Sequence, residues 1–157
     1  MNRKYEFTGE TRNWVGRTLH RIRAVRDFGD VKAGDLGGWI ETESNLSNDG
    51  NAWVYGNAMV YGNAWVYGNA WVYGDARVYG RKHILWISMI GSRDDTVTFM
   101  RAKDEKIIVA VGCFVGTIEE FEKQVDVTHG DNEHGKAYRL AIELAKLRID
   151  LDKEETK

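Results

Sequence analysis

The feature that most constrains this chain is a hexapeptide repeated five times between Asn51 and Gly80, "NAWVYGNAMVYGNAWVYGNAWVYGDARVYG". Even positions hold Ala, Val and Gly, while odd positions hold Asn or Asp, then Trp, Met or Arg, then Tyr. Because successive side chains of an extended chain point to opposite faces, this period gives one small apolar face and one aromatic face. No helical period fits the pattern.

The repeats meet at Gly-Asn, or at Gly-Asp in residues 74–75. Gly adopts positive φ without a steric penalty and Asn or Asp tolerates it, so a turn is predicted every six residues. Such turns can join the strands of an antiparallel meander, or bend the chain by about 120° at each corner of a triangular parallel coil. We favour the coil because it closes the Ala and Val face on itself, whereas a single sheet leaves that face uncovered.

The repeat V-Y-G-N-A-x resembles the hexapeptide pattern of left-handed parallel β-helix proteins, in which an aliphatic residue points inward and a small one follows four places later. Tyr departs from that pattern, because the family usually has a small residue there. The resemblance implies three hexapeptides per turn. The residue pairs expected to lie one above the other are Trp53 and Trp71, Tyr55 and Tyr73, Tyr61 and Tyr79, and Met59 and Arg77.

The expected fold is mainly β with a C-terminal α+β module. The predicted segments are an N-terminal β cap (1–40), the coil of two to three turns (41–90), the α+β module (91–150) and a disordered tail (151–157). A strand within 17–30, paired with 5–9, is expected to cap the open end of the coil. We interpret 47–50 as an inserted loop, and we expect the last coil to continue through Ile84 and Ile90, which keep the valine spacing.

The C-terminal module is predicted to be a three-stranded meander packed by two helices. The strands are expected in 83–90, 96–102 and 107–114. The first helix is expected to begin at Thr117, with Glu120 completing a capping box. After a loop at 128–135, the second helix is expected in 136–149. Its apolar stripe consists of Tyr138, Ile142, Ala145 and Ile149.

Composition and charge narrow the function classes. The 157 residues suit one core or two small ones, and no apolar run is long enough to span a membrane. The start of the chain does not resemble a signal peptide, and a single cysteine favours a reducing cytosol. The net charge is −2, yet residues 1–34 carry eight Lys and Arg against four Asp and Glu. A basic surface at Arg21, Arg23 and Arg26 could face an anionic partner, or it could be the solvent face of a strand.

Catalytic and metal chemistry have few candidates. Cys113, His129 and His134 lack the ligand spacing of a zinc site, so no metal and no cofactor are expected, and Cys113 is predicted to be a small buried side chain. An acyltransferase-like enzyme is an alternative that β-helix proteins suggest, with His83 or His129 as its base. Gly116 and Thr117 precede a predicted helix and could bind a phosphate or nucleotide together with Arg93, although a structural helix cap is the other interpretation.

The aromatic face must be covered by something, because this much apolar surface is unusual on a monomer. It comprises Trp53, Tyr55, Tyr61, Trp65, Tyr67, Trp71, Tyr73 and Tyr79. The coils could pack side by side in a homo-oligomer, most simply a trimer. The flanking modules of the same chain could fold over the face. The face could instead hold a ligand or a partner protein.

Beyond the repeat, the chain resembles a group of phage- and prophage-encoded proteins. The resemblance rests on "RTLHRIRAVRDFGDVKAGDLGGWIE", the repeats, and the blocks "IGSRDD", "GCFVGTIEEF" and "THGDN". It implies a viral origin and a β-helix, but no known reaction. We therefore expect a non-enzymatic phage accessory protein in the cytoplasm of the infected bacterium. It would bind a host protein or a nucleotide signal and antagonise defence, without binding membranes or double-stranded nucleic acid. A virion or assembly spacer is a further alternative.

Overall fold

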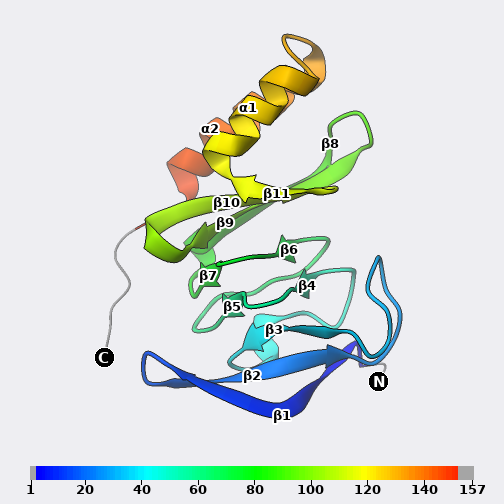
Figure 1. Cartoon of the computed structure of the whole chain (residues 1–157), viewed down its shortest axis with the longest axis vertical. Helices are drawn as coiled ribbons and strands as arrows, with labels where there is room; N and C mark the ends of the chain where they lie inside the picture. Colours follow the sequence, from blue (N-terminus) through cyan, green and yellow to red (C-terminus); the bar gives the residue numbers. More distant parts are fainter. Residues whose placement is uncertain (1–2, 152–157) are drawn as a thin grey trace.

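The fold is described from a computed structural model, in which residues 3–151 are placed. Four layers follow one another along the long axis: a β-hairpin, a coil, a four-stranded sheet and two helices (Figure 1). The chain is therefore mainly β with two helices. The expected disordered tail, 151–157, lies outside the described residues except for Leu151.

The strands are β1 (Tyr5–Trp14), β2 (Arg17–Ala24), β3 (Leu36–Ile40), β4 (Trp53–Val54), β5 (Met59–Val60), β6 (Trp71–Val72), β7 (Arg77–Val78), β8 (Ile84–Ile90), β9 (Asp95–Ala102), β10 (Lys106–Val111) and β11 (Phe114–Thr117). The α-helices are α1 (Ile118–Thr128) and α2 (Glu133–Arg148). Short 3₁₀ helices are η1 (Glu43–Asn45), η2 (Arg81–His83) and η3 (Lys103–Glu105).

The repeat forms a parallel solenoid rather than an antiparallel meander. Trp53 pairs with Trp71 and Met59 with Arg77, an offset of 18 residues in each case (71 − 53 and 77 − 59). Three hexapeptides therefore make one turn, as predicted. The rings of Tyr55 and Tyr73 stack at 4.0 Å, and those of Tyr61 and Tyr79 at 5.1 Å. All four predicted vertical pairs are confirmed.

The first turn of the coil is longer than the others. Leu46 bridges to Val66, and Trp39 pairs with Met59, so the offset there is 20 residues (66 − 46 and 59 − 39). From Trp53 onward the offset is 18. Two extra residues therefore lie between Leu46 and Trp53, which confirms the loop predicted at 47–50.

The interior of the coil is narrow and lined by the alanines and valines of the repeat. All ten of these side chains are buried: Ala52, Val54, Ala58, Val60, Ala64, Val66, Ala70, Val72, Ala76 and Val78. The corner glycines from Gly56 to Gly74 have φ between 55° and 65°, the left-handed region that a side chain disfavours. The small residues thus allow close packing of three faces, and the glycines allow the corners.

Both ends of the coil are covered by the rest of the chain. At the N-terminal end, β1 and β2 form an antiparallel hairpin, β2 pairs with β3, and β3 in turn pairs with β5 of the coil. At the other end, β9 lies over the last turn. The Trp71 N–H donates to Thr98 Oγ1 at 3.2 Å, and the Lys103 N–H donates to Asp75 O at 3.0 Å.

Two predictions about the C-terminal half are wrong. The sheet has four strands in the order β11-β10-β9-β8, because β11 forms a hairpin with β10 through a turn in which Gly112 has φ 54°. The coil does not continue through Ile84 and Ile90, since η2 interrupts the repeat and β8 then pairs antiparallel with β9.

The helices pack on the face of the sheet opposite the coil (Figure 1). Thr117 caps α1 and Glu120 completes the predicted capping box. The second helix begins at Glu133, inside the predicted loop, because the Asn132 side chain accepts the Gly135 N–H at 2.9 Å. Its predicted apolar stripe is buried. Within residues 3–151, no helix has the length and apolar character needed to cross a bilayer.

Candidate functional site

The structure divides the predicted aromatic interface into covered and open parts. Trp53 and Tyr61 are each only 1% exposed. Trp53 packs edge-to-face against Phe28, and the Trp14 Nε1–H donates to the Tyr61 hydroxyl at 3.1 Å. These two residues are therefore not available to another chain. Their prediction as interface residues is wrong, because the N-terminal segment that contains β1 and β2 folds over them.

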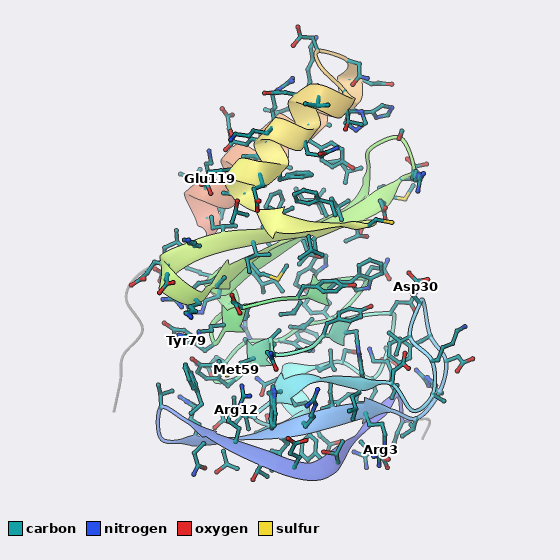
Figure 2. All side chains as sticks on the ribbon, in the orientation of Figure 1. Arg3, Arg12, Asp30, Met59, Tyr79 and Glu119 are labelled. Carbon is teal, nitrogen blue, oxygen red and sulfur yellow. The ribbon has the colours of Figure 1, made fainter. Side chains whose placement is uncertain are left out.

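Arginines cover aromatic rings on the side of the coil where Trp39, Tyr61 and Tyr79 lie. Figure 2 shows Tyr79, Met59 and Arg12 in a column there. The Arg12 guanidinium lies 4.4 Å from the centre of the Trp39 ring, and Arg101 lies 5.2 Å from that of Tyr79. Such cation–π contacts pair a charged group with the face of an aromatic ring. Arg101 itself is only 2% exposed, so this pair lies inside the protein.

A second aromatic cluster, formed by Tyr55, Trp71 and Tyr73, is half-buried. The Tyr55 and Tyr73 rings stack, and Trp71 meets both edge-on at 6.2 Å. Burial raises the pKa of Tyr55 and of Tyr73, so both hydroxyls stay protonated at neutral pH. Tyr55 and Tyr73 also pack against the coil-side core, so the stacked pair serves the vertical packing of the coil.

The remaining repeat aromatics, Trp65 and Tyr67, are 49% and 42% exposed. They form one wall of a cavity of about 370 Å³, here called the aromatic groove. Its lining residues are Trp65, Tyr67, Arg81, Ile84, Leu85 and Trp86. The centroids of Trp65 and Tyr67 are 4.1 Å apart, and Trp86 meets Tyr67 at 4.6 Å with nearly perpendicular rings. Three aromatic side chains and one cation thus converge on one hollow.

The groove includes two residues that sequence reasoning missed. Trp86 lies in β8 and Arg81 in η2, directly after the repeat. Alternation along β8 shows only that Trp86 and Leu85 face opposite ways. Leu85 packs with the helix-side core and Trp86 with the coil-side core. Whether Trp86 or Leu85 faces the coil depends on which face of the sheet meets the coil, and the sequence contains no signal for that orientation.

The predicted basic surface is engaged within the chain. Arg23 forms an ion pair with Glu6 at 2.6 Å, and Arg26 Nη2 donates to Asn48 O at 2.9 Å. Arg21 Nε donates to Gly37 O at 3.2 Å. These contacts favour the interpretation of the three arginines as solvent-side partners of the hairpin.

The predicted anion site is not assembled. The N-terminus of α1 is occupied by the Glu120 carboxylate, which accepts the Thr117 N–H at 2.8 Å. Hydrogen bonds from the Thr117 backbone and hydroxyl lower the pKa of Glu120, which keeps it anionic. Arg93 instead lines a cavity of about 190 Å³ whose lining includes Gly112 but neither Gly116 nor Thr117. The protein supplies its own anion at this helix, which favours the structural-cap interpretation over a phosphate or nucleotide site.

The histidines and the cysteine have ordinary surroundings. His83 is buried, and its Nδ1 accepts the Tyr79 N–H at 3.1 Å. His129 packs against His134 and Tyr138. Cys113 is exposed at the β10–β11 turn, so its prediction as a buried residue is wrong. In the part of the chain that the structure describes, no three His, Cys, Asp or Glu side chains are grouped so that they could hold a metal ion.

Comparisons with known proteins agree with the solenoid. A sequence profile described as the YdcK beta solenoid repeat matches residues 52–68. A protein of Escherichia coli K12 named "Uncharacterized acetyltransferase YdcK" is 43% identical over 51 residues. The match covers 32% of this chain and 15% of that protein. The similarity therefore supports a hexapeptide-repeat solenoid, and the matched repeat includes Trp65 and Tyr67.

Proposed function

We propose that the protein is a non-enzymatic binding protein whose aromatic groove holds a segment of another protein. The observation that carries this proposal is the exposure of Trp65 and Tyr67 beside Trp86 and Arg81, while the other repeat aromatics contact their own chain. The few residues that dominate the binding energy of protein interfaces are enriched in Trp, Tyr and Arg. A hollow lined by all three suits a partner side chain and the backbone around it.

The proposal includes the finer expectations from the sequence. We take the coil to be left-handed, the protein to be encoded by a phage or prophage, and its partner to be a protein of the infected bacterium. Blocking such a host protein would antagonise defence. A nucleotide signal is less well supported as the ligand, because Glu120 already occupies the expected anion site.

Homo-oligomerisation is the second candidate for the groove. A trimer would form through the aromatic face of the coil, and Trp53 and Tyr61 are buried by their own chain. What remains is the exposed pair Trp65 and Tyr67, which a second copy could cover. Native mass of the purified protein separates the two cases, because a single-chain mass leaves the groove open for a different partner.

An acetyltransferase is the enzyme alternative, prompted by the printed name of the relative. His83 adjoins the repeat, but its Nδ1 accepts a backbone N–H and its side chain is buried. This arrangement supports a structural role. Acetyl transfer by the purified protein that is lost in His83→Ala or His129→Ala would favour the enzyme instead.

The test of the binding proposal is a comparison of protein capture by matched variants. Trp65→Ser combined with Tyr67→Ser removes the groove wall. Leu147→Ser is the control, because it removes a side chain that is 81% exposed on α2, away from the groove. We expect proteins captured by the wild type from a bacterial lysate to be lost by the groove variant and retained by the control. Equal capture by all three would contradict the proposal.

A further inference from the structure

The aromatic groove occupies the place of a missing strand. On this face of the coil, Val66 pairs with the turn below, since its N–H donates to Asn45 O and its carbonyl accepts the Ser47 N–H, both at 2.9 Å. A regular next turn would place residues 83–85 above Trp65 and Tyr67, because each turn adds 18 residues. Instead η2 interrupts the coil, and Lys82 O accepts the Asp150 N–H at 2.8 Å.

The missing strand leaves backbone groups open. Along a strand, alternate residues direct their N–H and C=O groups to opposite sides, so Trp65 and Tyr67 direct theirs away from the turn that Val66 bonds. Among the described residues, neither the Trp65 N–H nor the Tyr67 N–H has a hydrogen-bond partner. An edge of this kind is a template for pairing with another chain.

The same chain shows what would fill such an edge. Two hexapeptides earlier, the Trp53 N–H donates to Ala70 O at 3.2 Å, and the Tyr55 N–H donates to Val72 O at 2.8 Å. Trp65 and Tyr67 occupy the equivalent positions of their own repeat. They therefore offer two donors spaced for two carbonyls that lie two residues apart on an extended strand.

Two basic side chains lie beside the open edge. Arg81 and Lys82 are exposed at the start of the interrupted turn, and Arg81 lines the groove. A carboxylate close to them would gain a charge-assisted hydrogen bond. The groove therefore offers backbone donors to an extended strand, the rings of Trp65 and Trp86 to apolar side chains, and Arg81 to one acidic group.

We propose that the open edge at Trp65 and Tyr67 binds an extended peptide segment of a partner protein by β-strand addition, with an acidic residue of the segment near Arg81. The segment would replace the missing strand of the coil. This mode of recognition takes affinity from backbone hydrogen bonds and specificity from side-chain pockets. The inference rests on the proposed function, since it names how the same groove holds its partner.

Peptides selected from a displayed library of random dodecapeptides, with the full-length protein as bait, serve as the probe. Binding is then compared for Tyr67→Val, which keeps the backbone N–H, and Tyr67→Pro, which removes it. Proline is tolerated at a strand edge where its nitrogen faces solvent. We expect Tyr67→Pro to bind about tenfold more weakly than Tyr67→Val, because a bound carbonyl loses its donor.

The outcomes distinguish the two proposals. Equal affinities of Tyr67→Val and Tyr67→Pro, both below wild type, would overturn strand addition and leave a side-chain groove. Wild-type affinity in both variants, or a library that yields no peptide, would overturn the groove as a binding site as well. If Tyr67→Pro does not fold, amide hydrogen exchange of the wild type replaces it. The Trp65 and Tyr67 amides are expected to exchange more slowly with peptide bound, and unchanged exchange overturns strand addition.

Discussion

At the residue scale, Lys4 is the most unusual group in the chain. Its side chain is buried, its Nζ donates to Ala52 O at 2.6 Å, and it lies 4.9 Å from the centre of the Phe28 ring. Burial, together with the charge of Arg26, lowers the pKa of Lys4 to about 8. The hydrogen bond from Lys4 holds the N-terminal segment against the first turn of the coil, while burial disfavours the charged form of the amine.

This burial predicts a pH dependence of stability. Since an unfolded lysine titrates near pH ~10.4, the unfolded chain holds more protons at Lys4 than the folded chain above about pH 8. The free energy of unfolding should therefore rise by about 1 kcal/mol between about pH 8 and about pH 9.5, and Lys4→Met should lack this rise. Urea denaturation at several pH values measures it. The same slope in both proteins would contradict the prediction.

Buried tyrosines set the upper limit of the pH range in which stability should rise. Burial raises the pKa of Tyr5, of Tyr55 and of Tyr138. Above about pH 10, unfolded tyrosines lose protons that the folded chain retains, so their contribution lowers stability as the pH rises. Below that pH the contribution of Lys4 can be read separately.

At the element scale, the corners of the coil differ in how much room they leave. Gly56 and Gly62 have similar φ values of 55° and 62°. A Cβ added to Gly62 would lie 2.6 Å from Tyr79 O, whereas one added to Gly56 would meet nothing within 4 Å. The Gly62 corner lies directly under the next turn, and the Gly56 corner is open.

Alanine at the two corners should therefore have unequal costs. Gly56→Ala has only the cost of the left-handed backbone, about 1 kcal/mol. Gly62→Ala adds a clash with a backbone carbonyl and should cost about 2 to 4 kcal/mol. Urea unfolding of the two variants compares them directly, with Gly56→Ala as the control for backbone strain. Equal losses would mean that Tyr79 moves aside without cost.

At the scale of the whole molecule, one core crosses three layers. It runs from Tyr5 and Ile22 of the hairpin through the coil to Met100 and Ala110 of the sheet. Neighbouring residues of the same strands, such as Phe99, belong to the helix-side core. One face of the sheet packs in the core shared with the hairpin and the coil, and the other face packs against the helices. The sheet therefore couples the hairpin to the helices.

This continuity predicts a single unfolding transition. Ile22→Ala, in the hairpin, should cost about 2 to 4 kcal/mol. It should shift the urea midpoint equally for tryptophan fluorescence and for the far-ultraviolet dichroism of the helices. Leu147→Ala, at an exposed position, should change stability by less than about 0.5 kcal/mol. Separate midpoints for the two signals would show that the layers unfold independently.

Strictly periodic and strictly local features could be predicted from the sequence. The 18-residue turn, the four vertical pairs and the inserted loop follow from spacing, because a strand has a fixed period and a glycine corner has few alternatives. The capping box at Thr117 follows from contacts three residues apart. The sequence therefore determined the solenoid, its register and one helix start.

Only the tertiary structure decided which aromatic residues remain open. Trp53 and Trp65 occupy equivalent positions of the same repeat, yet one is buried and the other half exposed. The difference comes from the N-terminal segment folding over one face and from η2 ending the coil on another. Burial depends on contacts between segments far apart in the chain, and a repeat that makes all its copies alike contains no information about which copy a distant segment will cover.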